Sequence, residues 1–223
     1  MGDSFIVVAV DGGAASGKSS TSKILSKEMN LLYVNTGSHY RSLTWAILQA
    51  NIDPKDERAI STYLETIPIG HLVEDREARI TLESNVLGDE IRSEAVNNAV
   101  SVVAAIPAVR QFLLAHQRSY ARLAQDSGFA GLIMEGRDIG SVIFPDADFR
   151  FFMFADPAER ARRRELEGQV DSIQKRDQLD QQRKTAPLTC PEGAIKIDTT
   201  HNTLEEVAEK IRHMIQSGKK NSD

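Results

Sequence analysis

Residues 12–20, with the sequence GGAASGKSS, have the residue types and spacing of a phosphate-binding loop. Gly12, Gly17, Lys18 and Ser19 satisfy the pattern G-x-x-x-x-G-K-[ST]. In such a loop the glycines let backbone N–H groups point at phosphate oxygens, the lysine reaches the β and γ phosphates, and the hydroxyl ligates Mg²⁺. A glycine-rich turn that only caps a helix is the alternative, and it is disfavoured because the loop lies between an apolar run and an amphipathic segment. The pattern therefore predicts a nucleotide-binding site.

The loop does not by itself decide which class of nucleotide-dependent protein this is. A GTPase is disfavoured because it would carry an Asn-Lys-x-Asp segment after a strand, and Lys196-Ile197-Asp198 is a poor substitute. An ATPase that works on nucleic acid is disfavoured because the net charge is −5 and only 6% of the residues are aromatic, which leaves neither a basic surface nor a stacking platform. A small-molecule kinase is therefore favoured.

Arginines follow two of the apolar runs, where an acceptor for a phosphoryl group would bind. Tyr40 and Arg41 come after the run at 31–34, and Arg137 and Asp138 come after a later run. In open α/β sheets, ligands bind at the carboxyl ends of the strands. For each residue alone, an exposed arginine at the start of a helix is the ordinary alternative. The repetition at two strand ends favours a site for an anionic substrate.

Further arginines fall on two predicted helices late in the chain. One helix face has residues at i, i+4 and i+7, namely Arg176, Asp180 and Arg183. The preceding helix carries Arg160, Arg163 and Arg164. The alternative for such faces is a solvated surface with i,i+4 pairing. Phosphoryl transfer depends mainly on positioning and on charge neutralisation by Mg²⁺, Lys and Arg, so these guanidinium groups suit a kinase.

The elements that would position these residues alternate between strands and helices. Apolar, β-branched runs predict strands at 5–10, 31–34, 129–134, 149–155 and 194–197. Helical spacing and caps predict helices at 19–29, 94–104, 109–122, after the Asp156-Pro157 pair, and from the capping box at Thr203 to about Ile215. This alternation predicts an α/β fold with a doubly wound parallel sheet. Residues 67–92 would insert a β-hairpin into it.

Length and composition place these elements in one domain. A chain of 223 residues with 41% hydrophobic content is long enough for one core with insertions. The single cysteine, Cys190, fits a reducing compartment. No segment resembles a signal peptide or a membrane span, and the five histidines lack metal-ligand spacing. We therefore expect a cytoplasmic protein that binds neither membranes nor nucleic acid polymers.

Taken in order, the motifs resemble those of bacterial cytidylate kinases, a family of nucleoside monophosphate kinases. The resemblance runs from Val7 to about Ile215 and is highly specific as an ordered set. Its motifs are Asp11-Gly12 through Lys18-Ser19, Thr36-Gly37 with Tyr40-Arg41, Asn98-Ala99-Val100-Ser101 through Pro107 to Arg110, Glu135-Gly136-Arg137-Asp138-Ile139-Gly140 with Val142-Ile143-Phe144-Pro145-Asp146-Ala147, Glu159-Arg160-Ala161 with Arg163-Arg164, and Arg176-Asp177 with Asp180, Arg183 and Ala186-Pro187-Leu188.

The resemblance implies a P-loop kinase that transfers the γ-phosphoryl group of ATP to CMP or dCMP with Mg²⁺, as a monomer. It implies one kinase domain with a core at 1–35, 123–155 and 184–223, a monophosphate-binding region with the hairpin insertion at 36–122, and a lid at 156–183. The residues implied to bind the ATP phosphates form one loop: Gly12, Gly13, Ala14, Ala15, Ser16, Gly17, Lys18, Ser19 and Ser20. Ser19 would also ligate Mg²⁺.

The resemblance also implies where the acceptor nucleotide binds. Its phosphate would contact Arg41 and Arg137, beside Thr36 and Tyr40. Cytosine would contact Ser101, Arg110, Asp138 and Arg183, and the pentose would contact Arg176 and Asp180. The side chains implied to act on the transferred group are Lys18, Arg137, Arg163 and Arg176.

The chain departs from the family pattern at several places. Gly13 and Ser20 stand where proline and threonine are common, and Asn35 and Glu135 replace aspartates at two strand ends. Only residues 165–175 separate the arginine cluster from Arg176, which makes the lid connection shorter than expected for the family. Two alternatives stay open. One is another small-molecule P-loop kinase, in which residues 101–110 would have no role; the other is a non-catalytic nucleotide-binding regulator, which the short lid favours.

Overall fold

A seven-stranded sheet forms the centre of the structure, a computed structural model that describes residues 5–166, 173–183 and 185–218 without the side chains of 173–176. Its strands are β1 (Ile6–Gly12), β2 (Leu31–Asn35), β3 (Ile69–Glu74), β4 (Glu77–Leu82), β5 (Gly131–Gly136), β6 (Phe149–Phe154) and β7 (Ile195–Asp198). The strand order is β3-β4-β2-β5-β1-β6-β7, and all neighbours pair in parallel except β3 with β4. The predicted α/β fold with a mostly parallel sheet is confirmed.

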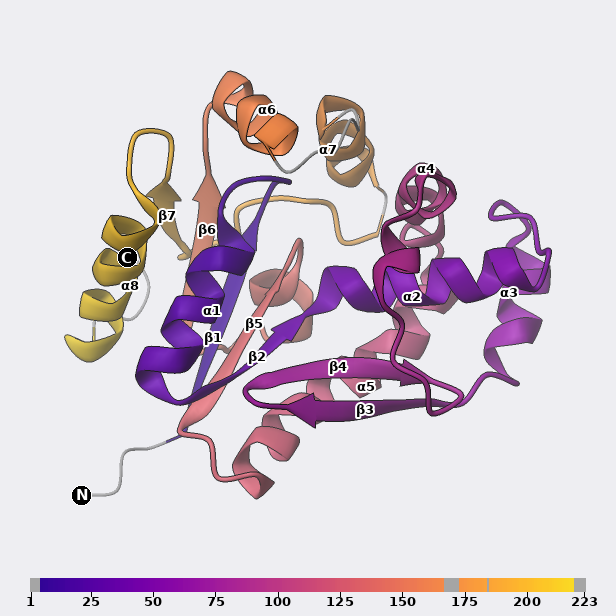
Figure 1. The fold of residues 1–223 in the computed structure, drawn as a ribbon, viewed down its shortest axis with the longest axis horizontal. Coiled ribbons are helices and arrows are strands. Elements are labelled where there is room, and N and C mark those ends of the chain that lie inside the picture. Colours follow the sequence, from indigo (N-terminus) through magenta and orange to yellow (C-terminus); the bar gives the residue numbers. More distant parts are fainter. Residues whose placement is uncertain (1–4, 167–172, 184, 219–223) are drawn as a thin grey trace.

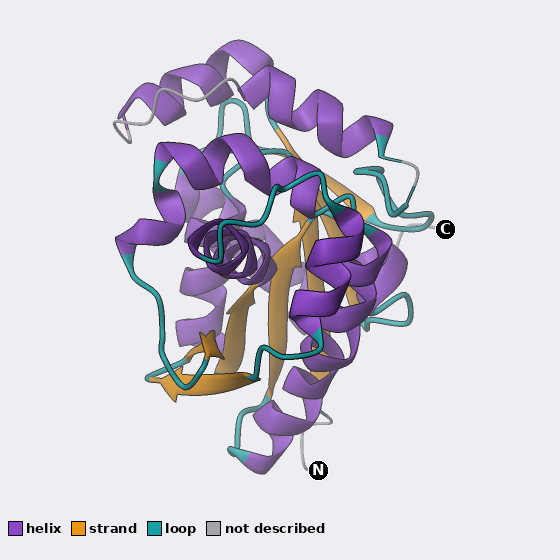
Figure 2. Cartoon of the chain, turned by 90° about the vertical axis from the view of Figure 1, so that its right-hand side faces the viewer, coloured by secondary structure: helices purple, strands orange, loops and turns teal. Residues whose placement is uncertain are grey.

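Helices cover both sides of this sheet (Figure 2). They are α1 (Lys18–Met29), α2 (Thr36–Gln49), α3 (Glu57–Leu64), α4 (Glu94–Val103), α5 (Pro107–Asp126), α6 (Pro157–Leu166), α7 (Ile173–Gln182) and α8 (Leu204–Gln216). Two short turns are also helical, a 3-10 turn at Asp89–Arg92 and a π-helical turn at Ile139–Ile143. Helices α6 and α7 lie together beyond the carboxyl ends of β1 and β6, at the top of Figure 1. They therefore lie at the edge where the sequence predicts the site.

Successive residues of the central strands alternate between two apolar clusters. Val8, Tyr33 and Ile133 pack with α1 and α8, whereas their neighbours Leu32 and Leu132 pack with α5. All five side chains are buried. Strands covered by helices on both faces are apolar at every position, which explains the continuous apolar runs. A third cluster joins α2, α3, α4 and α5 into a separate lobe over β4.

The hairpin predicted within residues 67–92 is present as β3 and β4, and it joins the main sheet. Tyr33 and Val34 of β2 pair in parallel with Glu77 and Ala78 of β4. The antiparallel partner β3 forms the outer edge of the sheet. The hairpin thus extends the sheet and fixes the start of the lobe that carries α4 and α5.

Strand ends differ from the predicted boundaries where they enter the site. β1 continues two residues past the predicted end to Gly12, and β5 spans Gly131–Gly136 instead of 129–134. Both extensions contain a buried acid, Asp11 and Glu135. A prediction based on apolar residues ends each strand before such an acid, because it treats a charged residue as exposed. Of the predicted lid connection at 165–175, residues 167–172 lie outside the described part of the chain.

Among the described residues, no single helix is long and apolar enough to cross a membrane. The pair Glu94–Val103 and Pro107–Asp126 passes a length and composition test only when taken together, with a bend of 94° between them.

Candidate active site

The P-loop, residues 12–20, connects the end of β1 to the start of α1 through backbone geometry that requires its glycines. Gly12 has φ +151°, and a Cβ on it would lie 2.1 Å from the carbonyl oxygen of Met153. Gly17 has φ +86° and caps α1 without a side-chain hydrogen bond. The N–H groups of the first turn of α1 therefore remain directed at the loop, where a helix N-terminus favours an anion.

Lys18 is buried and folds back over its own loop. Its Nζ donates to the carbonyl oxygen of Gly13 at 2.6 Å and to Oγ of Ser16 at 3.3 Å. Burial, together with the nearby charge of Arg137, lowers the pKa of Lys18 from 10.5 to about 7. A bound phosphate would replace these neutral partners with negative charge, so the arrangement suits an anionic ligand.

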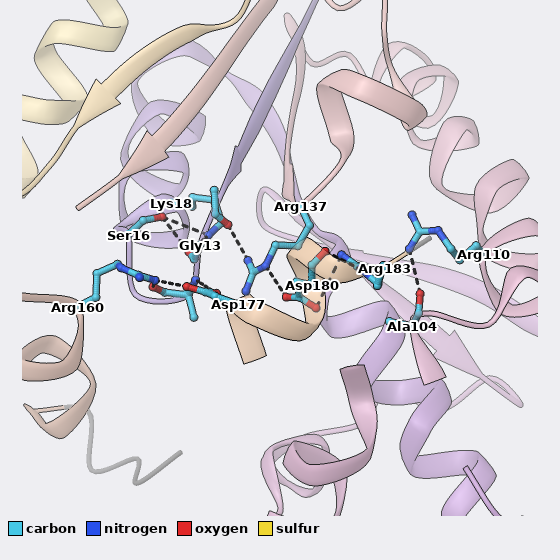
Figure 3. Close-up of polar contacts among 12 residues, drawn as sticks. Gly13, Ser16, Lys18, Ala104, Arg110, Arg137, Arg160, Asp177, Asp180 and Arg183 are labelled. Carbon is cyan, nitrogen blue, oxygen red and sulfur yellow. Dashed lines mark hydrogen bonds and ion pairs between the residues drawn. The ribbon is translucent and has the colours of Figure 1, made fainter. Parts of the chain in front are cut away.

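Arg137 links three parts of the site. Its Nη1 donates to the carbonyl oxygen of Gly12 at 2.8 Å, and its Nε donates to Oδ2 of Asp180 on α7 at 3.0 Å. Arg137 itself follows β5. One guanidinium thus joins the P-loop, the end of β5 and α7, as Figure 3 shows.

Asp11, at the end of β1, fixes the loop that follows β5. Its two carboxylate oxygens accept the N–H groups of Ile139 at 2.7 Å and Gly140 at 2.8 Å. Burial raises the pKa of Asp11 to about 7, although these two hydrogen bonds oppose that shift. The sequence singles out Asp11 only as part of a motif, whereas the structure gives it a role in positioning the segment after Arg137.

A second group of charged side chains lies on the acceptor side of the site. We call it the acceptor pocket, and its residues are Tyr40, Ser101, Arg110, Asp138 and Arg183. Arg110 and Asp138 form a buried ion pair, and Arg110 also donates to the carbonyl oxygen of Ala104 at 3.1 Å. The Arg110 guanidinium lies 5.5 Å from the centre of the Tyr40 ring. Burial raises the pKa of Asp138 and lowers that of Arg183.

Arg183 has hydrogen-bonding capacity left over in this pocket. Its Nε donates to the backbone oxygen of Asp180 at 3.3 Å, and its buried Nη2 lies 3.8 Å from Oδ1 of Asp180, an ion pair without a hydrogen bond from Nη2 to any described residue. A buried donor without a hydrogen bond costs free energy. The pocket is therefore suited to a ligand that brings a hydrogen-bond acceptor to Arg183.

Helices α6 and α7 contact the P-loop through Asp177 and Arg160. The N–H of Ala14 donates to Oδ1 of Asp177 at 3.2 Å, and Arg160 forms an ion pair with the same carboxylate. Arg160 also donates to the carbonyl oxygen of Ala14 at 3.2 Å. Asp177 thus accepts a hydrogen bond from an N–H group of the phosphate-binding loop that a phosphate would otherwise use.

Arg163 and Arg164 point in different directions although they are adjacent. Arg163 donates to Oε1 of Glu159 at 2.9 Å and to the carbonyl oxygen of Thr199 at 2.6 Å. Hydrogen bonds from Arg162 and Arg163 lower the pKa of Glu159 to about 2. Arg164, by contrast, lines both the central cleft and the cavity over the P-loop. The structure therefore separates Arg163, implied to be catalytic, from the cleft.

Most predicted site residues line one central cleft. These residues are Ala14, Ala15, Lys18, Ser19, Thr36, Tyr40, Arg41, Ser101, Arg137, Asp138, Asp180 and Arg183. The adjoining cavity over the P-loop adds Ser16, Gly17 and Ser20. Gly12 and Gly13 form the loop without lining either cavity, Arg110 lies behind Asp138, and the side chain of Arg176 lies outside the described part of the chain.

Sequence reasoning missed two features of this region. A further cavity lies between the P-loop, α6 and the segment after β7, and its lining includes Thr199, Asn202 and Leu204. Its signal in the sequence is the polar stretch after a buried strand, at the edge where α/β proteins bind ligands. The other feature is Arg92, which lines the central cleft and the P-loop cavity.

Glu135, one of the residues that departs from the family pattern, has one free carboxylate oxygen. The Tyr33 hydroxyl donates to Oε1 at 2.5 Å, while Oε2 is buried with no hydrogen-bond partner among the described residues. Glu135 and Ser19 both line the central cleft. A hydroxyl and a carboxylate oxygen in one cleft are ligands that Mg²⁺ prefers.

Comparison with known proteins agrees with this geometry. The family model described as cytidylate kinase matches residues 8–217. A cytidylate kinase from Caldanaerobacter subterraneus subsp. tengcongensis is 40% identical over 96% of each chain, and one from Clostridioides difficile is 38% identical over 92% of this chain and 96% of the relative. A thymidylate kinase structure from Candida albicans is 13% identical, and the match covers 97% of this chain and 93% of that one with a TM-score of 0.45.

The family match covers nearly the whole chain, including every strand end that contributes to the cleft. Both relatives are matched over almost their full length. This chain therefore belongs to the cytidylate kinase family and is a nucleoside monophosphate kinase.

Proposed function

We propose that this protein transfers the γ-phosphoryl group of ATP to CMP or dCMP, forming CDP or dCDP and ADP. The observation that supports this most is the shared cleft, which Lys18 and Ser19 of the P-loop line together with Arg41 and Arg137. A donor and an acceptor phosphate bound there would lie side by side. Holding two reactants in contact is a large part of catalysis for this reaction type.

The donor site would consist of the P-loop and the cavity after β7. The triphosphate would lie along the P-loop and exchange for the partners that Lys18 has at Gly13 and Ser16. The adenine would enter the cavity bounded by Ala15, Leu204 and Val207. Arg163 would then lie beside the adenine, because it lines the cavity after β7 as well.

The acceptor pocket supports recognition of cytosine. Cytosine offers an amino donor together with ring nitrogen and carbonyl acceptors, so it needs both an acceptor and a donor from the protein. Asp138 supplies carboxylate oxygens, and Nη2 of Arg183, which has no hydrogen bond to the described residues, supplies a donor. Uracil exchanges the amino group for a carbonyl, which would face the Asp138 carboxylate unfavourably. Ser101 and Asp180 complete the lining toward the base and the pentose.

The residues present fit Mg²⁺ as the cofactor. Ser19 and the unpartnered Oε2 of Glu135 line one cleft, and among the described residues no three His, Cys, Asp or Glu side chains form a metal site alone. Mg²⁺ usually keeps several waters and binds substrate phosphates along with one or two protein ligands. Bound there, it would neutralise charge on the donor phosphates.

In the reaction, an oxygen of the CMP phosphate attacks the γ-phosphorus of ATP, the bond from that phosphorus to the bridging oxygen breaks, and ADP leaves. The chain would position both phosphates and neutralise charge in transit through Lys18, Arg41 and Arg137. Closure of α6 and α7 over the cleft would exclude water and prevent ATP hydrolysis. The division into core, monophosphate-binding region and lid, the monomeric state and the cytoplasmic location remain predictions.

A coupled ADP-release assay tests this proposal across CMP, dCMP, UMP and AMP. We expect kcat/KM for CMP or dCMP to exceed that for AMP and UMP by at least about tenfold, since each mispaired buried polar contact costs about 1–3 kcal/mol. Faster turnover with AMP than with CMP would overturn it.

A further inference from the structure

Arg92 ends the 3-10 turn Asp89–Arg92, on the acceptor side of the cleft, and its backbone is held from two sides. Arg41 Nη1 donates to the carbonyl oxygen of Ile91 at 2.9 Å, and Asn97 Nδ2 donates to that of Arg92 at 2.9 Å. Ser93 follows directly and caps α4. Hydrogen bonds from α2 and α4 therefore hold the backbone of the turn that carries Arg92 in place.

The side chain of Arg92 is exposed, and no hydrogen bond or ion pair connects its guanidinium to any described residue. Other arginines of the site are engaged: Arg110 pairs with Asp138, and Arg137 pairs with Asp180. Arg92 lines the cavity over the P-loop together with Arg164 and residues from Ala15 to Ser20. It also lines the central cleft. A guanidinium without a protein partner among the described residues thus lines the same cavity as the phosphate-binding loop.

The positive charge of Arg92 suits a phosphate ligand in this cavity. A guanidinium is always protonated in proteins and matches the geometry of phosphate oxygens. Arg92 therefore supplies a permanent positive charge to the cavity over the P-loop.

We propose that Arg92 binds the terminal phosphate of the donor nucleotide and is a catalytic residue for phosphoryl transfer. This inference rests on the proposed kinase function. The hydrogen bond from Arg41 to Ile91 gives it a structural link to the acceptor side, because the residue implied to bind the CMP phosphate supports the turn that carries Arg92. Donor and acceptor phosphates would then be engaged through one connected segment.

The test compares Arg92→Met with the matched control Arg58→Met. Arg58 is an exposed arginine of the same lobe, on α3, away from the cleft, so both variants change the net charge equally. Calorimetry measures the affinity of the free protein for inorganic triphosphate and, separately, for CMP. Steady-state assays with ATP and CMP measure kcat.

For Arg92→Met we expect kcat to fall about 100-fold, the usual effect of losing one preorganised group that stabilises transition-state charge. Affinity for triphosphate should fall about tenfold, the scale of one charge-assisted hydrogen bond, while CMP affinity stays as in wild type. Arg92→Lys should recover part of kcat because it keeps the charge. Arg58→Met should match wild type in every measurement.

Two results would overturn the inference. One is an Arg92→Met variant that matches Arg58→Met in kcat and triphosphate affinity. The other is a loss of CMP affinity with triphosphate affinity retained, which would make Arg92 an acceptor residue. If wild type binds triphosphate but shows no CMP-dependent turnover, the proposed function fails, and the triphosphate comparison alone then supports or overturns donor binding by Arg92.

Discussion

The acceptor pocket and the P-loop differ in what their charged groups already contact. In the acceptor pocket, Arg110 and Asp138 are buried and paired with each other. At the P-loop, Asp177 accepts the N–H of Ala14, and Lys18 donates to the loop's own carbonyl oxygen at Gly13. In the first case a ligand can bind to groups already in place. In the second, the ligand phosphates must replace protein partners.

This difference indicates that acceptor binding and donor binding place different demands on the protein. Acceptor recognition uses a pocket built on α2, α4, α5, the end of β5 and Arg183 just after α7, in which Arg110 and Asp138 are paired before binding. Donor binding would free Lys18 and Ala14 from their present partners and shift Asp177, so it is coupled to the position of α7. Substitutions in each region should therefore affect donor and acceptor binding separately.

Replacing Lys18 should have the largest effect on transfer. In Lys18→Ala, kcat should fall by roughly 10³-fold, because a charged group next to the transferred phosphoryl is lost. CMP affinity should remain within about twofold, as the acceptor pocket does not use Lys18. Steady-state kinetics and CMP calorimetry measure the two quantities. A parallel loss of CMP affinity would show that the two regions are not separate.

Arg110→Met should show the opposite selectivity. It leaves the Asp138 carboxylate buried without its partner, so the free energy of unfolding should fall by about 3 kcal/mol. CMP use should fall by about 100-fold in kcat/KM, the scale of a lost buried charge contact, while triphosphate affinity stays near wild type. Denaturant unfolding, kinetics and calorimetry measure these effects.

Two checks accompany that variant. The double variant Arg110→Met with Asp138→Asn should recover most of the stability, since no buried charge remains alone, without recovering CMP use. Equal losses of CMP and triphosphate binding in Arg110→Met would contradict the assignment of Arg110 to the acceptor.

Asp177→Asn tests the claim that a protein carboxylate competes with donor phosphate at the P-loop. Removing the negative charge beside Ala14 should tighten triphosphate binding by about fivefold, corresponding to about 1 kcal/mol. The control Asp126→Asn changes a carboxylate on α5 that pairs with Arg122 at the surface. Unchanged or weaker triphosphate binding in Asp177→Asn would mean that this carboxylate supports the donor site instead.

The smallest predicted effect is a proton taken up on binding. Lys18 in the free site has a pKa of about 7, and phosphate should raise it, so at pH 8 binding of triphosphate should take up a substantial fraction of one proton. Affinity should therefore fall as the pH rises above 7. Calorimetry in buffers with different ionisation enthalpies measures the uptake. Lys18→Met should abolish it, and persistence in that variant would point to another group.

Lys18 should affect the free energy of unfolding in the opposite direction to triphosphate affinity as the pH rises. In the unfolded chain Lys18 titrates near 10.5, so between pH 7 and 10.5 the unfolded state binds more protons than the native state. The Lys18 contribution to the free energy of unfolding of the free protein should therefore rise with pH across that window. The rise should be missing in Lys18→Met.

The sequence was sufficient to predict the fold class and most of the cleft, because apolar runs and the glycine pattern are local signals. It did not predict that β4 pairs with β2, since pairing depends on contacts between distant segments. It ended β5 too early because Glu135 is buried in the strand, and its carboxylate is held by Tyr33, 102 positions away.

The distinction between neighbouring arginines was also beyond the sequence. Arg163 and Arg164 differ by one step of a helix, about 100° around its axis, and this step directs one toward Thr199 and the other into the cleft. Arg92 gave no signal because a single arginine near Asp89 and Glu90 has the composition of an ordinary exposed turn. Its significance comes from the fold, which makes Arg92 a lining residue of the cavity over the P-loop.

Transfer of label from γ-labelled ATP tests whether the γ-phosphoryl group passes directly from ATP to CMP within one cleft. With CMP present, we expect label to move into CDP at the rate at which ADP forms, and almost none to be released as inorganic phosphate. Without CMP, ADP formation should nearly stop. Release of inorganic phosphate at the same rate with and without CMP would contradict the account, because donor and acceptor would then not react in one cleft.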